Sequence, residues 1–345
     1  MSTACETCAV HNAGQLIKLG VNVDKWDYVV ALAGNPNVGK STVFNALTGL
    51  RQHTGNWPGK TVARAEGGFA YAEARHKLID LPGTYSLLAS STDEEIARDF
   101  ILFGRPDVTV IVVDATRLER NLNLVLQVLE ITERVVVCVN LMDEAERTGL
   151  TLDTRALSRE LGVPVVATAA RERDGIPQLT QAIADVAAGR LRGKPRRRLK
   201  QGKAVEQAVE QLSAEIETLI PALPNRRWVA LRLLDGDEQI GTALREGELG
   251  LLEHRGIDDA RHAVSGGDSE TTEKLLTLAS DLRWNVGGDF HQSLMESIYA
   301  EAAEIADHVV APDGQPPKFQ LGRAIEDPNG GVKRHVRSTD DGMNR

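Results

Sequence analysis

Residues 34–41 place glycines, a lysine and a hydroxyl group at the spacing that binds a nucleoside triphosphate. The segment is Gly34-Asn35-Pro36-Asn37-Val38-Gly39-Lys40-Ser41. Glycines let backbone N–H groups approach the phosphates, Lys40 carries positive charge to the β and γ oxygens, and the Ser41 hydroxyl can coordinate Mg²⁺. An apolar run, Tyr28 to Ala33, comes before the segment, and a helical pattern, Thr42 to Leu47, comes after it. This strand–loop–helix order predicts a P-loop that binds a nucleotide through Gly34 to Thr42.

Two downstream segments supply groups that can meet the γ-phosphate and a magnesium ion. Thr61 lies in a glycine-bearing loop, where its hydroxyl can reach both. Asp80-Leu81-Pro82-Gly83 follows the strand-like run Arg75 to Ile79. The aspartate can hold magnesium through water, and the Gly83 N–H can contact the γ-phosphate. We therefore expect a magnesium site formed by Ser41, Thr61 and Asp80.

Two further segments predict recognition of guanine. Asn140-Leu141-Met142-Asp143 ends the β-rich run Val135 to Val139. The Asp143 carboxylate can accept hydrogen bonds from N1–H and the exocyclic amine of guanine, whereas adenine has an acceptor at N1 and no amine at C2. Because an unpaired buried carboxylate costs free energy, the pocket should prefer GTP and GDP over adenine nucleotides. Val163 to Ala167 is typical of a last strand, and we expect the turn Thr168-Ala169-Ala170 to close over the base with its backbone amides.

Together these segments resemble the cytosolic N-terminal part of the ferrous iron transporter B (FeoB) family. The resemblance rests on Gly34 to Ser41, on Gly55-Asn56-Trp57-Pro58-Gly59-Lys60-Thr61, on Asp80-Leu81-Pro82-Gly83-Thr84-Tyr85-Ser86-Leu87 and on Leu118-Glu119-Arg120-Asn121-Leu122. It is close over Val29 to Arg190 and extends, by helical character alone, to the region of residue 310. The resemblance implies a GTPase domain and a small helical domain that slows nucleotide release, both preceding a polytopic iron permease.

The resemblance also implies a function and an ion site. It implies a GTPase at the cytoplasmic, inner face of the cell membrane that regulates ferrous iron uptake, with an iron permease as its partner. It further implies that Asn37 helps to hold K⁺ beside the β- and γ-phosphates, and that backbone carbonyls of Gly55 and Trp57 complete the ion's shell. A fixed cation at that place offsets the charge that grows as the bond to the γ-phosphoryl group breaks.

The residues predict hydrolysis of GTP to GDP and phosphate by in-line attack of water. The expected catalytic groups are Lys40, Asn37, Thr61 and Gly83, acting with Mg²⁺. Thr84 stands where many small GTPases carry a water-orienting glutamine, and the sequence identifies no arginine finger. Unassisted turnover should therefore be slow. GTP binding should order Gly55 to Thr61 (switch I) and Asp80 to Glu95 (switch II), and hydrolysis should release them.

The N-terminal extension contains a second set of groups that could bind a metal. Cys5, Cys8 and His11 follow a C-x-x-C-x-x-H spacing that could hold Zn²⁺ or Fe²⁺ if a fourth ligand came from elsewhere. The alternative, a flexible tail with two incidental thiols, is left open. His53 and His76 have no partners at metal spacing, and we interpret both as ordinary surface or core histidines.

Strand and helix patterns alternate from Tyr28 to Ala188, which predicts a doubly wound, mostly parallel α/β sheet. We expect Gly67-Gly68 to break the strand after switch I. Five segments with a 3.6-residue period predict an all-helical domain: Val205 to Ile220, Arg226 to Leu234, Gln239 to Glu246, Glu270 to Arg283 and Phe290 to Val309. The predicted organisation is an extension at 1–27, a GTPase domain at 28–190, a basic linker at 191–200, a helical domain at 201–311 and a disordered tail at 312–345.

Composition favours a two-domain cytoplasmic protein. The 345 residues fit two domains of ~150 residues each, and the net charge of −9 argues against non-specific binding to nucleic acid. Met1 to Val10 lacks the features of a signal peptide, and apolar runs such as Val108 to Val113 are far shorter than the ~18 to 20 residues of a membrane helix. Three cysteines make no extracellular disulfide framework, which favours a reducing compartment.

Two other classes of function use the same loops. A GTPase of ribosome assembly or RNA modification is one, although the acidic balance of the chain opposes it. A module that docks a partner in a nucleotide-dependent way is the other. The sequence also leaves open whether the protein forms homo-oligomers, and whether the chain is a fragment or a natural stand-alone relative of the family.

Overall fold

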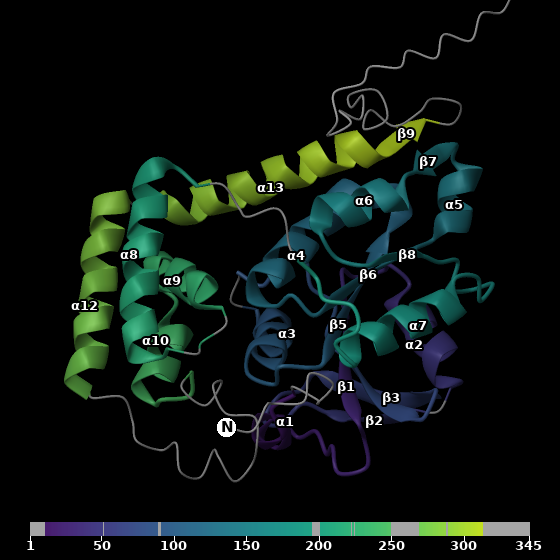
Figure 1. Cartoon of the computed structure of the whole chain (residues 1–345), viewed down its shortest axis with the longest axis horizontal. Helices are drawn as coiled ribbons and strands as arrows, with labels where there is room; N and C mark the ends of the chain where they lie inside the picture. The colour runs from purple at the N-terminus through teal and green to yellow at the C-terminus, as the bar shows by residue number, and fades with distance from the viewer. Residues whose placement is uncertain are drawn as a thin grey trace, which may run out of the picture.

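The computed structural model describes residues 11–50, 52–88, 91–194, 201–221, 223, 225–249, 269–287 and 289–312. Within these residues, a seven-stranded sheet carries helices on both faces, and a group of further helices stands beside it (Figure 1). The sheet is built from the region where strand and helix patterns alternate in the sequence. The predicted α/β class, followed by a helical domain, is confirmed.

The sheet has the strand order β2-β3-β4-β1-β5-β6-β8. Strands β4, β1, β5, β6 and β8 are parallel neighbours, whereas β2 and β3 pair in antiparallel fashion at one edge. On β1, Val29, Ala31 and Ala33 face one hydrophobic core, and Val30 and Leu32 face the other. Burial on both faces explains why this strand is a continuous apolar run in the sequence. The strands are β1 (Tyr28–Gly34), β2 (Gln52–Asn56), β3 (Ala63–Tyr71), β4 (Ala74–Asp80), β5 (Val108–Asp114), β6 (Val135–Asn140) and β8 (Val165–Ala167).

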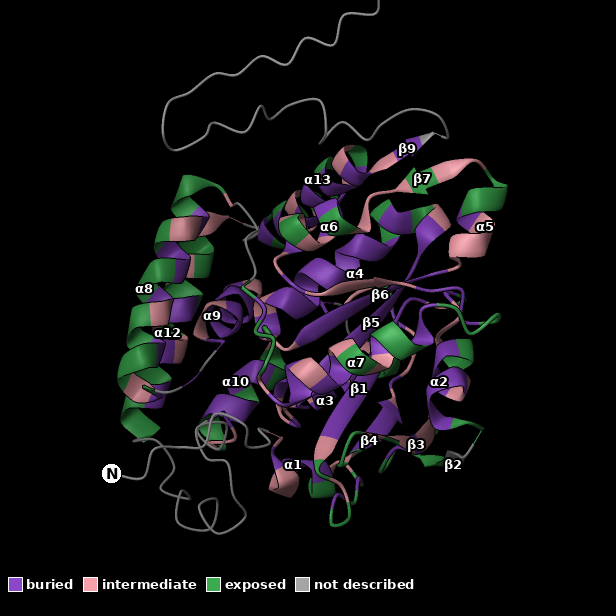
Figure 2. Cartoon of the chain, turned by 45° about the vertical axis from the view of Figure 1, so that its right-hand side comes forward, coloured by how far each residue is buried: buried purple, intermediate pink, exposed green. Residues whose placement is uncertain are grey.

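Helices cover both faces of the sheet. On one face lie α2 (Lys40–Thr48) and α7 (Ile176–Ala187), and on the other lie α3 (Thr92–Leu102), α4 (Leu118–Ile131) and α6 (Thr154–Leu161). A short 3-10 helix, η1 (Ala115–Arg117), leads into α4, and α5 (Met142–Arg147) follows β6. Almost every residue of α4 is buried, because the helical domain covers the side that turns away from the sheet (Figure 2).

The helical domain packs against the GTPase domain along its last helix. It consists of α8 (Lys203–Leu219), α9 (Arg226–Asp235), α10 (Glu238–Arg245), α12 (Ser269–Val286) and α13 (Phe290–Val309), at the places that the sequence period predicts. Helix α13 runs along α4 and α6 and ends in β9 (Val310–Pro312) (Figure 1). Strand β9 pairs in antiparallel fashion with β7 (Leu150–Leu152), which follows α5. The end of the predicted helical domain is therefore fastened to the GTPase domain.

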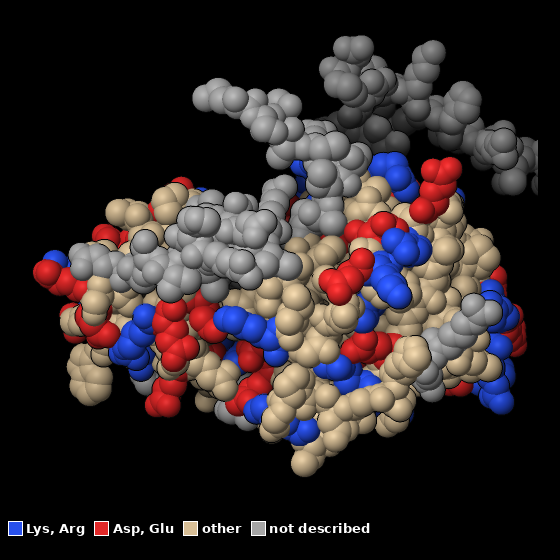
Figure 3. All heavy atoms as spheres, turned by 90° about the horizontal axis from the view of Figure 1, so that it is seen from below, with Lys and Arg blue, Asp and Glu red and all other residues tan. Residues whose placement is uncertain are grey.

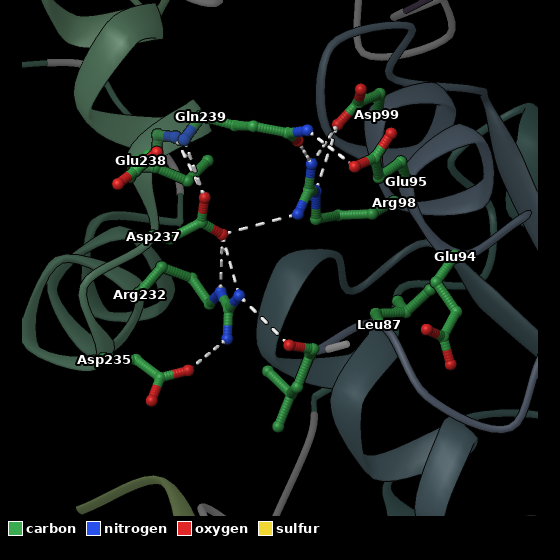
Figure 4. A network of polar contacts seen from close by, with 12 residues as sticks. Leu87, Glu94, Glu95, Arg98, Asp99, Arg232, Asp235, Asp237, Glu238 and Gln239 are labelled. Atoms are coloured by element: carbon green, nitrogen blue, oxygen red, sulfur yellow. Dashed lines mark hydrogen bonds and ion pairs between the residues drawn. The ribbon is translucent and has the colours of Figure 1, made fainter. Parts of the chain in front are cut away.

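Charged side chains form a buried cluster between the two domains, seen in Figure 4. Arg98 of α3 lies 3.4 Å from Asp237, the N-cap of α10, and also contacts Gln239. The same Asp237 carboxylate accepts from Arg232 of α9 at 2.8 Å. Arg232 donates in addition to the carbonyl of Leu88, within switch II, at 3.3 Å. Both arginine side chains are almost fully buried. We call Arg98, Arg232 and Asp237 the interface cluster.

Strand β3 corrects one expectation. It runs from Ala63 to Tyr71 without interruption, so the predicted break at Gly67-Gly68 is wrong. Gly68 is needed for packing rather than for a turn, because a Cβ there would clash with the ring of Trp26. A glycine inside a strand can mark a close approach as well as a break, and the sequence does not distinguish the two.

His53 and His76, interpreted from the sequence as ordinary surface or core histidines, occupy such positions in the structure. His53 is exposed on β2, whereas His76 is fully buried on β4. The ring of His76 stacks between Tyr28 and Phe69, with centroid separations of 5.3 and 4.9 Å. Burial lowers the pKa of His76 below its usual 6.5. This histidine therefore serves as a neutral aromatic ring of the core.

The predicted N-terminal extension is packed on the GTPase domain from residue 11 onward. Asn12 caps α1 (Ala13–Lys18) by accepting from Gln15 N–H, and Leu16 is fully buried. Residues 195–200 of the predicted linker and residues 313–345 of the predicted tail lie outside the described residues. Among the described residues, no helix combines the length and the apolar character needed to cross a membrane. Acidic and basic side chains intermix over the face shown in Figure 3.

Candidate functional site

The P-loop connects the end of β1 to the start of α2. Gly34 closes the strand, and Lys40 opens the helix. Asn37 and Gly39 both have left-handed backbones, with φ of 67° and 80°. A side chain at Gly39 would also clash with the amide of Asn140. Position 39 therefore needs glycine for its conformation and for its close approach to β6.

Asn140 ties together the loops that surround the predicted nucleotide site. Its Nδ2 donates to the carbonyl of Val38 at 3.0 Å, and its Oδ1 accepts from the hydroxyl of Thr168 at 3.1 Å and from Ala170 N–H at 3.0 Å. The side chain is 1% exposed. The sequence assigns Asn140 to base recognition, whereas the geometry makes it a positioning residue between the P-loop and the turn at 168–170. We call Asn140 and these partners the amide cluster.

The turn at 168–170 differs in detail from its expected role. The N–H groups of Thr168 and Ala169 donate to the carbonyls of Val139 and Asp174, at 2.7 and 3.2 Å. Ala170 N–H donates to Asn140. In this conformation, all of the amides that the sequence assigns to the base already have partners within the protein. Their contact with a base stays a prediction.

Asp143 is held in the first turn of α5, next to that turn. The preceding Leu141 has a left-handed backbone, with φ of 63°, and the N–H of Met142 donates to the Thr168 carbonyl at 3.2 Å. Asp143 itself is half-buried. Asp143 therefore follows directly on a residue whose backbone contacts Thr168, and the contact of its carboxylate with guanine stays a prediction.

Lys40 and Asp80, which the sequence places in one site, are in contact. The ammonium group of Lys40 donates to the Asp80 carboxylate and, at 2.7 Å, to the carbonyl of Leu81. Burial raises the pKa of the Asp80 carboxyl above its usual range, and the charge of Lys40 opposes this shift. The lysine expected to bind the phosphates and the expected magnesium ligand thus lie side by side at the end of β4.

Switch II folds back over the end of β1. The N–H of Thr84 donates to the Gly34 carbonyl at 3.2 Å, and a Cβ at Gly83 would lie 3.4 Å from the Cα of Pro36. Gly83 therefore lies close to the P-loop, and the contact of its N–H with the γ-phosphate stays a prediction. The Thr84 side chain is buried, and its hydroxyl donates to the Ser86 carbonyl at 2.7 Å. In this conformation, the Thr84 hydroxyl proton is therefore used within switch II.

Switch I is a hairpin whose tryptophan enters the core. Gly55 lies on β2, opposite Arg64 of β3. The ring of Trp57 is 2% exposed and meets Phe100 edge-on at 5.7 Å. The Trp57 carbonyl accepts from Lys60 N–H at 3.0 Å, and Thr61 is exposed. The structure therefore gives Trp57 a packing role, and the expected potassium shell of Asn37, Gly55 and Trp57 stays a prediction.

A polar cavity of about 470 Å³ lies against the P-loop and contains residues that the motifs do not single out. These are Tyr85, Asp114, Thr116, Arg117, Arg120, Asn121 and Glu144. The guanidinium of Arg120 stacks over the Tyr85 ring at 4.4 Å. Asn35 also lines the cavity, and both polar atoms of its buried amide lack a hydrogen-bond partner among the described residues. Tyr85, Arg120 and Asn121 of this wall lie in the segments Asp80 to Leu87 and Leu118 to Leu122, which carried the family resemblance in the sequence.

The proposed N-terminal metal ligands are only partly covered by the structure. Cys5 and Cys8 lie outside the described residues, and among the described residues His11 contacts the Asp107 carboxylate. Among the described residues, no three histidine, cysteine, aspartate or glutamate side chains form a group that could hold a metal ion. Binding of Zn²⁺ or Fe²⁺ at the N-terminus stays a prediction.

Comparison with known proteins identifies the family. The family model described as ferrous iron transport protein B matches residues 28–183, and the model described as the FeoB cytosolic helical domain matches residues 202–311. The chain belongs to the ferrous iron transport protein B (FeoB) family. The predicted resemblance is thus confirmed over both domains, and residues 28–183 form the P-loop GTPase domain of a FeoB protein.

A curated sequence relative and solved structures both support the family assignment. The Fe(2+) transport protein A/Fe(2+) transporter FeoB fusion protein of Porphyromonas gingivalis is 40% identical over 226 residues, which are 65% of this chain and 27% of the relative. The cytosolic domain of the T. maritima FeoB iron transporter in its GDP form is 31% identical, with a TM-score of 0.61, and the alignment covers 82% of this chain and 98% of that one. Its GMPPNP form is 31% identical, with a TM-score of 0.62, and covers 82% and 99%. The chain thus spans about a quarter of the length of the curated relatives that it matches.

Proposed function

We propose that this chain binds GTP with Mg²⁺, hydrolyses it slowly, and thereby regulates ferrous iron uptake by a membrane permease. The observation that carries the proposal is the meeting of Lys40, Asp80 and Leu81 at the end of the P-loop. It brings the phosphate-binding lysine to the segment that senses the γ-phosphate. The names of the relatives supply the iron-transport context, and neighbours in GDP and GMPPNP forms supply the nucleotide.

The donor set suits magnesium. Ser41, the second residue of α2, is exposed, and its chain neighbour Lys40 contacts the Asp80 carboxylate. Oxygen ligands of this kind are those that Mg²⁺ prefers, and the Thr61 hydroxyl supplies a third oxygen when switch I closes. When bound, Mg²⁺ neutralises charge on the β- and γ-phosphate oxygens.

The groups of the chain have distinct roles in hydrolysis. Lys40 exchanges its contact with Asp80 for the β- and γ-phosphates, and P-loop N–H groups surround the phosphates. Gly83 N–H donates to the γ-phosphate, and water attacks in line. Because the Thr84 hydroxyl is held by Ser86, no side chain at that position orients the water. We therefore expect slow turnover without an activator.

Potassium is the activator that we propose. Asn37 is exposed at the outer turn of the P-loop, so its side-chain oxygen can take part in a cation shell, with carbonyls of Gly55 and Trp57 as further ligands. When bound, K⁺ offsets charge that develops as the γ-phosphoryl group leaves. Because Gly55 lies in β2 and Trp57 in the core, we expect switch I to rearrange when this shell forms.

The proposed cellular setting is the cytoplasmic face of the membrane, beside an iron permease. The solved neighbours are cytosolic domains of FeoB, and the curated relatives are much longer iron transporters. A family match across both domains favours iron transport over ribosome assembly or RNA modification.

Replacing Na⁺ by K⁺ at constant ionic strength tests the proposal. We expect the GTPase rate of the parent protein to rise in K⁺, and Asn37→Ala to remove that rise while retaining most of the GTP affinity. Asn22→Ala, in an exposed loop remote from the P-loop motif, is the matched control and should keep the full potassium response. Equal rates in both salts would eliminate potassium, and absence of hydrolysis in either salt would eliminate the GTPase assignment.

A further inference from the structure

Residues 84–88 of switch II are folded into a tight turn. The Thr84 hydroxyl accepts from Ser86 N–H at 3.3 Å and donates to the Ser86 carbonyl at 2.7 Å. The Ser86 hydroxyl accepts in turn from Leu88 N–H at 3.0 Å. Leu87 and Leu88 are buried in the hydrophobic core that they share with α3 and α4. These bonds and this burial make residues 84–88 one compact unit.

Gln127 of α4 anchors this turn. Its Oε1 accepts from Leu87 N–H at 2.6 Å and from the Ser86 hydroxyl at 3.0 Å, and the residue is 2% exposed. Because Leu87 N–H can only donate, the amide oxygen must face the turn, which leaves the Gln127 NH₂ group buried without a partner among the described residues. An unpaired buried donor costs free energy, so an apolar side chain would fill this place at a lower cost. We therefore ascribe to Gln127 a role in positioning the turn.

The anchored turn leads directly back to the P-loop. Thr84 N–H donates to the Gly34 carbonyl at 3.2 Å, and a Cβ on Gly83 would lie 3.4 Å from the Cα of Pro36. Gly83 thus stands between the P-loop and the turn that Gln127 holds, and any displacement of the turn displaces Gly83 N–H. A donor aids catalysis only when it is already placed at the developing charge, so small displacements lower the rate strongly.

We propose that Gln127 is a positioning residue for GTP hydrolysis, which fixes the turn at 84–88 and thereby holds Gly83 N–H where the γ-phosphate can accept from it. This inference rests on the proposed function, in which Gly83 N–H contacts the γ-phosphate. It also divides switch II. The turn on α4 keeps its place in the nucleotide-free, GDP and GTP states, and rearrangement is confined to the residues before it. Because GDP lacks the γ-phosphate, Gln127 has no bearing on GDP affinity.

Gln127→Met tests the proposal in the full chain, because methionine has a similar length and lacks a strong acceptor. We expect kcat for GTP in K⁺ to fall by about 10–100-fold. In isothermal titration, affinity for GMPPNP should fall by about 10-fold, whereas affinity for GDP should stay at the parent value. Gln15→Met, at a buried glutamine of α1 outside the P-loop and both switches, is the matched control and should match the parent in all three quantities.

Amide hydrogen exchange of the parent protein supplies a readout that does not depend on turnover. Leu87 N–H should be protected equally in the nucleotide-free, GDP and GMPPNP forms, because Gln127 accepts from it in each. Loss of this protection on binding of GMPPNP would overturn the proposal. An unchanged preference for GMPPNP over GDP in a folded Gln127→Met variant would do the same.

Two results separate failure of this inference from other failures. Should Gln127→Met not fold, as judged by circular dichroism, the exchange of Leu87 N–H in the parent decides alone. A parent protein that hydrolyses no GTP would remove the GTPase assignment, whereas the exchange and affinity measurements would still test the anchoring by Gln127.

Discussion

The amide cluster and the interface cluster are both buried and polar, but they are built from different groups. The amide cluster joins the P-loop to the turn at 168–170 through the neutral side chain of Asn140. The interface cluster joins α3 to the helical domain through Arg98, Arg232 and Asp237, which are all charged. One cluster borders the P-loop, which the sequence predicts to bind phosphates, and the other closes a contact between domains.

The difference between the two clusters follows from the charges that surround each of them. A neutral amide can donate to one loop and accept from another without adding charge beside the phosphates. Between the domains, two arginines are compensated by nearby carboxylates. Burial pushes the pKa of Asp237 upward, but Arg232 and Arg98 together bring it below its usual 3.8. The Asp99 carboxyl, where burial outweighs Arg98, has a raised pKa instead. Asp237 is therefore the ionised carboxylate that both arginines share, beside the separate contacts of Arg98 with Asp99 and of Arg232 with Asp235.

The largest loss of stability should come from removing the carboxylate of Asp237, which both arginines contact. Asp237→Ala leaves Arg98 and Arg232 buried without this partner, and we expect the free energy of unfolding to fall by about 3–5 kcal/mol. Urea unfolding measures it. Lys274→Ala, which breaks the exposed pair with Glu270 on α12, is the control and should change stability by about 0.5 kcal/mol or less. Equal stabilities of these two variants would show that the interface cluster contributes nothing beyond a surface pair.

A smaller effect, expressed in binding, should come from the amide cluster. Asn140→Ala removes the partner of Val38, Thr168 and Ala170, and each buried group left unpaired costs about 1–3 kcal/mol. We expect the protein to fold but to bind GDP at least about 10-fold more weakly, as measured by isothermal titration. Asn123→Ala, at a buried asparagine of α4 outside the P-loop region, is the matched control. Unchanged GDP affinity in Asn140→Ala would remove the positioning role.

The two clusters also differ in how far the sequence predicts them. The P-loop, Asp80, Asn140 and Asp143 lie in short contiguous motifs, so residue type and spacing alone place them. The interface cluster joins Arg98 to Asp237, 139 positions apart, and no local pattern connects them. The same holds for β7 and β9, which pair only because α13 returns along α4. Contacts of this kind depend on the packed fold, and periodicity does not encode them.

Errors and omissions near the site have a similar cause. Gly68 was expected to break a strand. The position requires glycine for another reason, because a Cβ there would clash with the ring of Trp26, which comes from another part of the chain. The turn at 168–170 was located correctly, yet the sequence does not show that its amides are used by Val139, Asp174 and Asn140. The cavity wall at Tyr85 and Arg120 combines residues from switch II and α4. Motifs therefore located the loops, and tertiary packing decided which groups in them remain available to a ligand.

Nucleotide selectivity tests the central claim most directly, because it depends on Asp143, the carboxylate that the sequence assigns to the guanine edge. Isothermal titration with GTP, ATP and xanthosine triphosphate should show strong preference of the parent protein for GTP. Asp143→Asn should weaken GTP binding and improve binding of xanthosine triphosphate, whose C2 carbonyl can accept from the new amide. Asp174→Asn, beyond the turn at 168–170, is the control and should keep the parent's preference. Equal affinity of the parent for ATP and GTP, or an Asp143→Asn variant with unaltered selectivity, would contradict the assignment of this site.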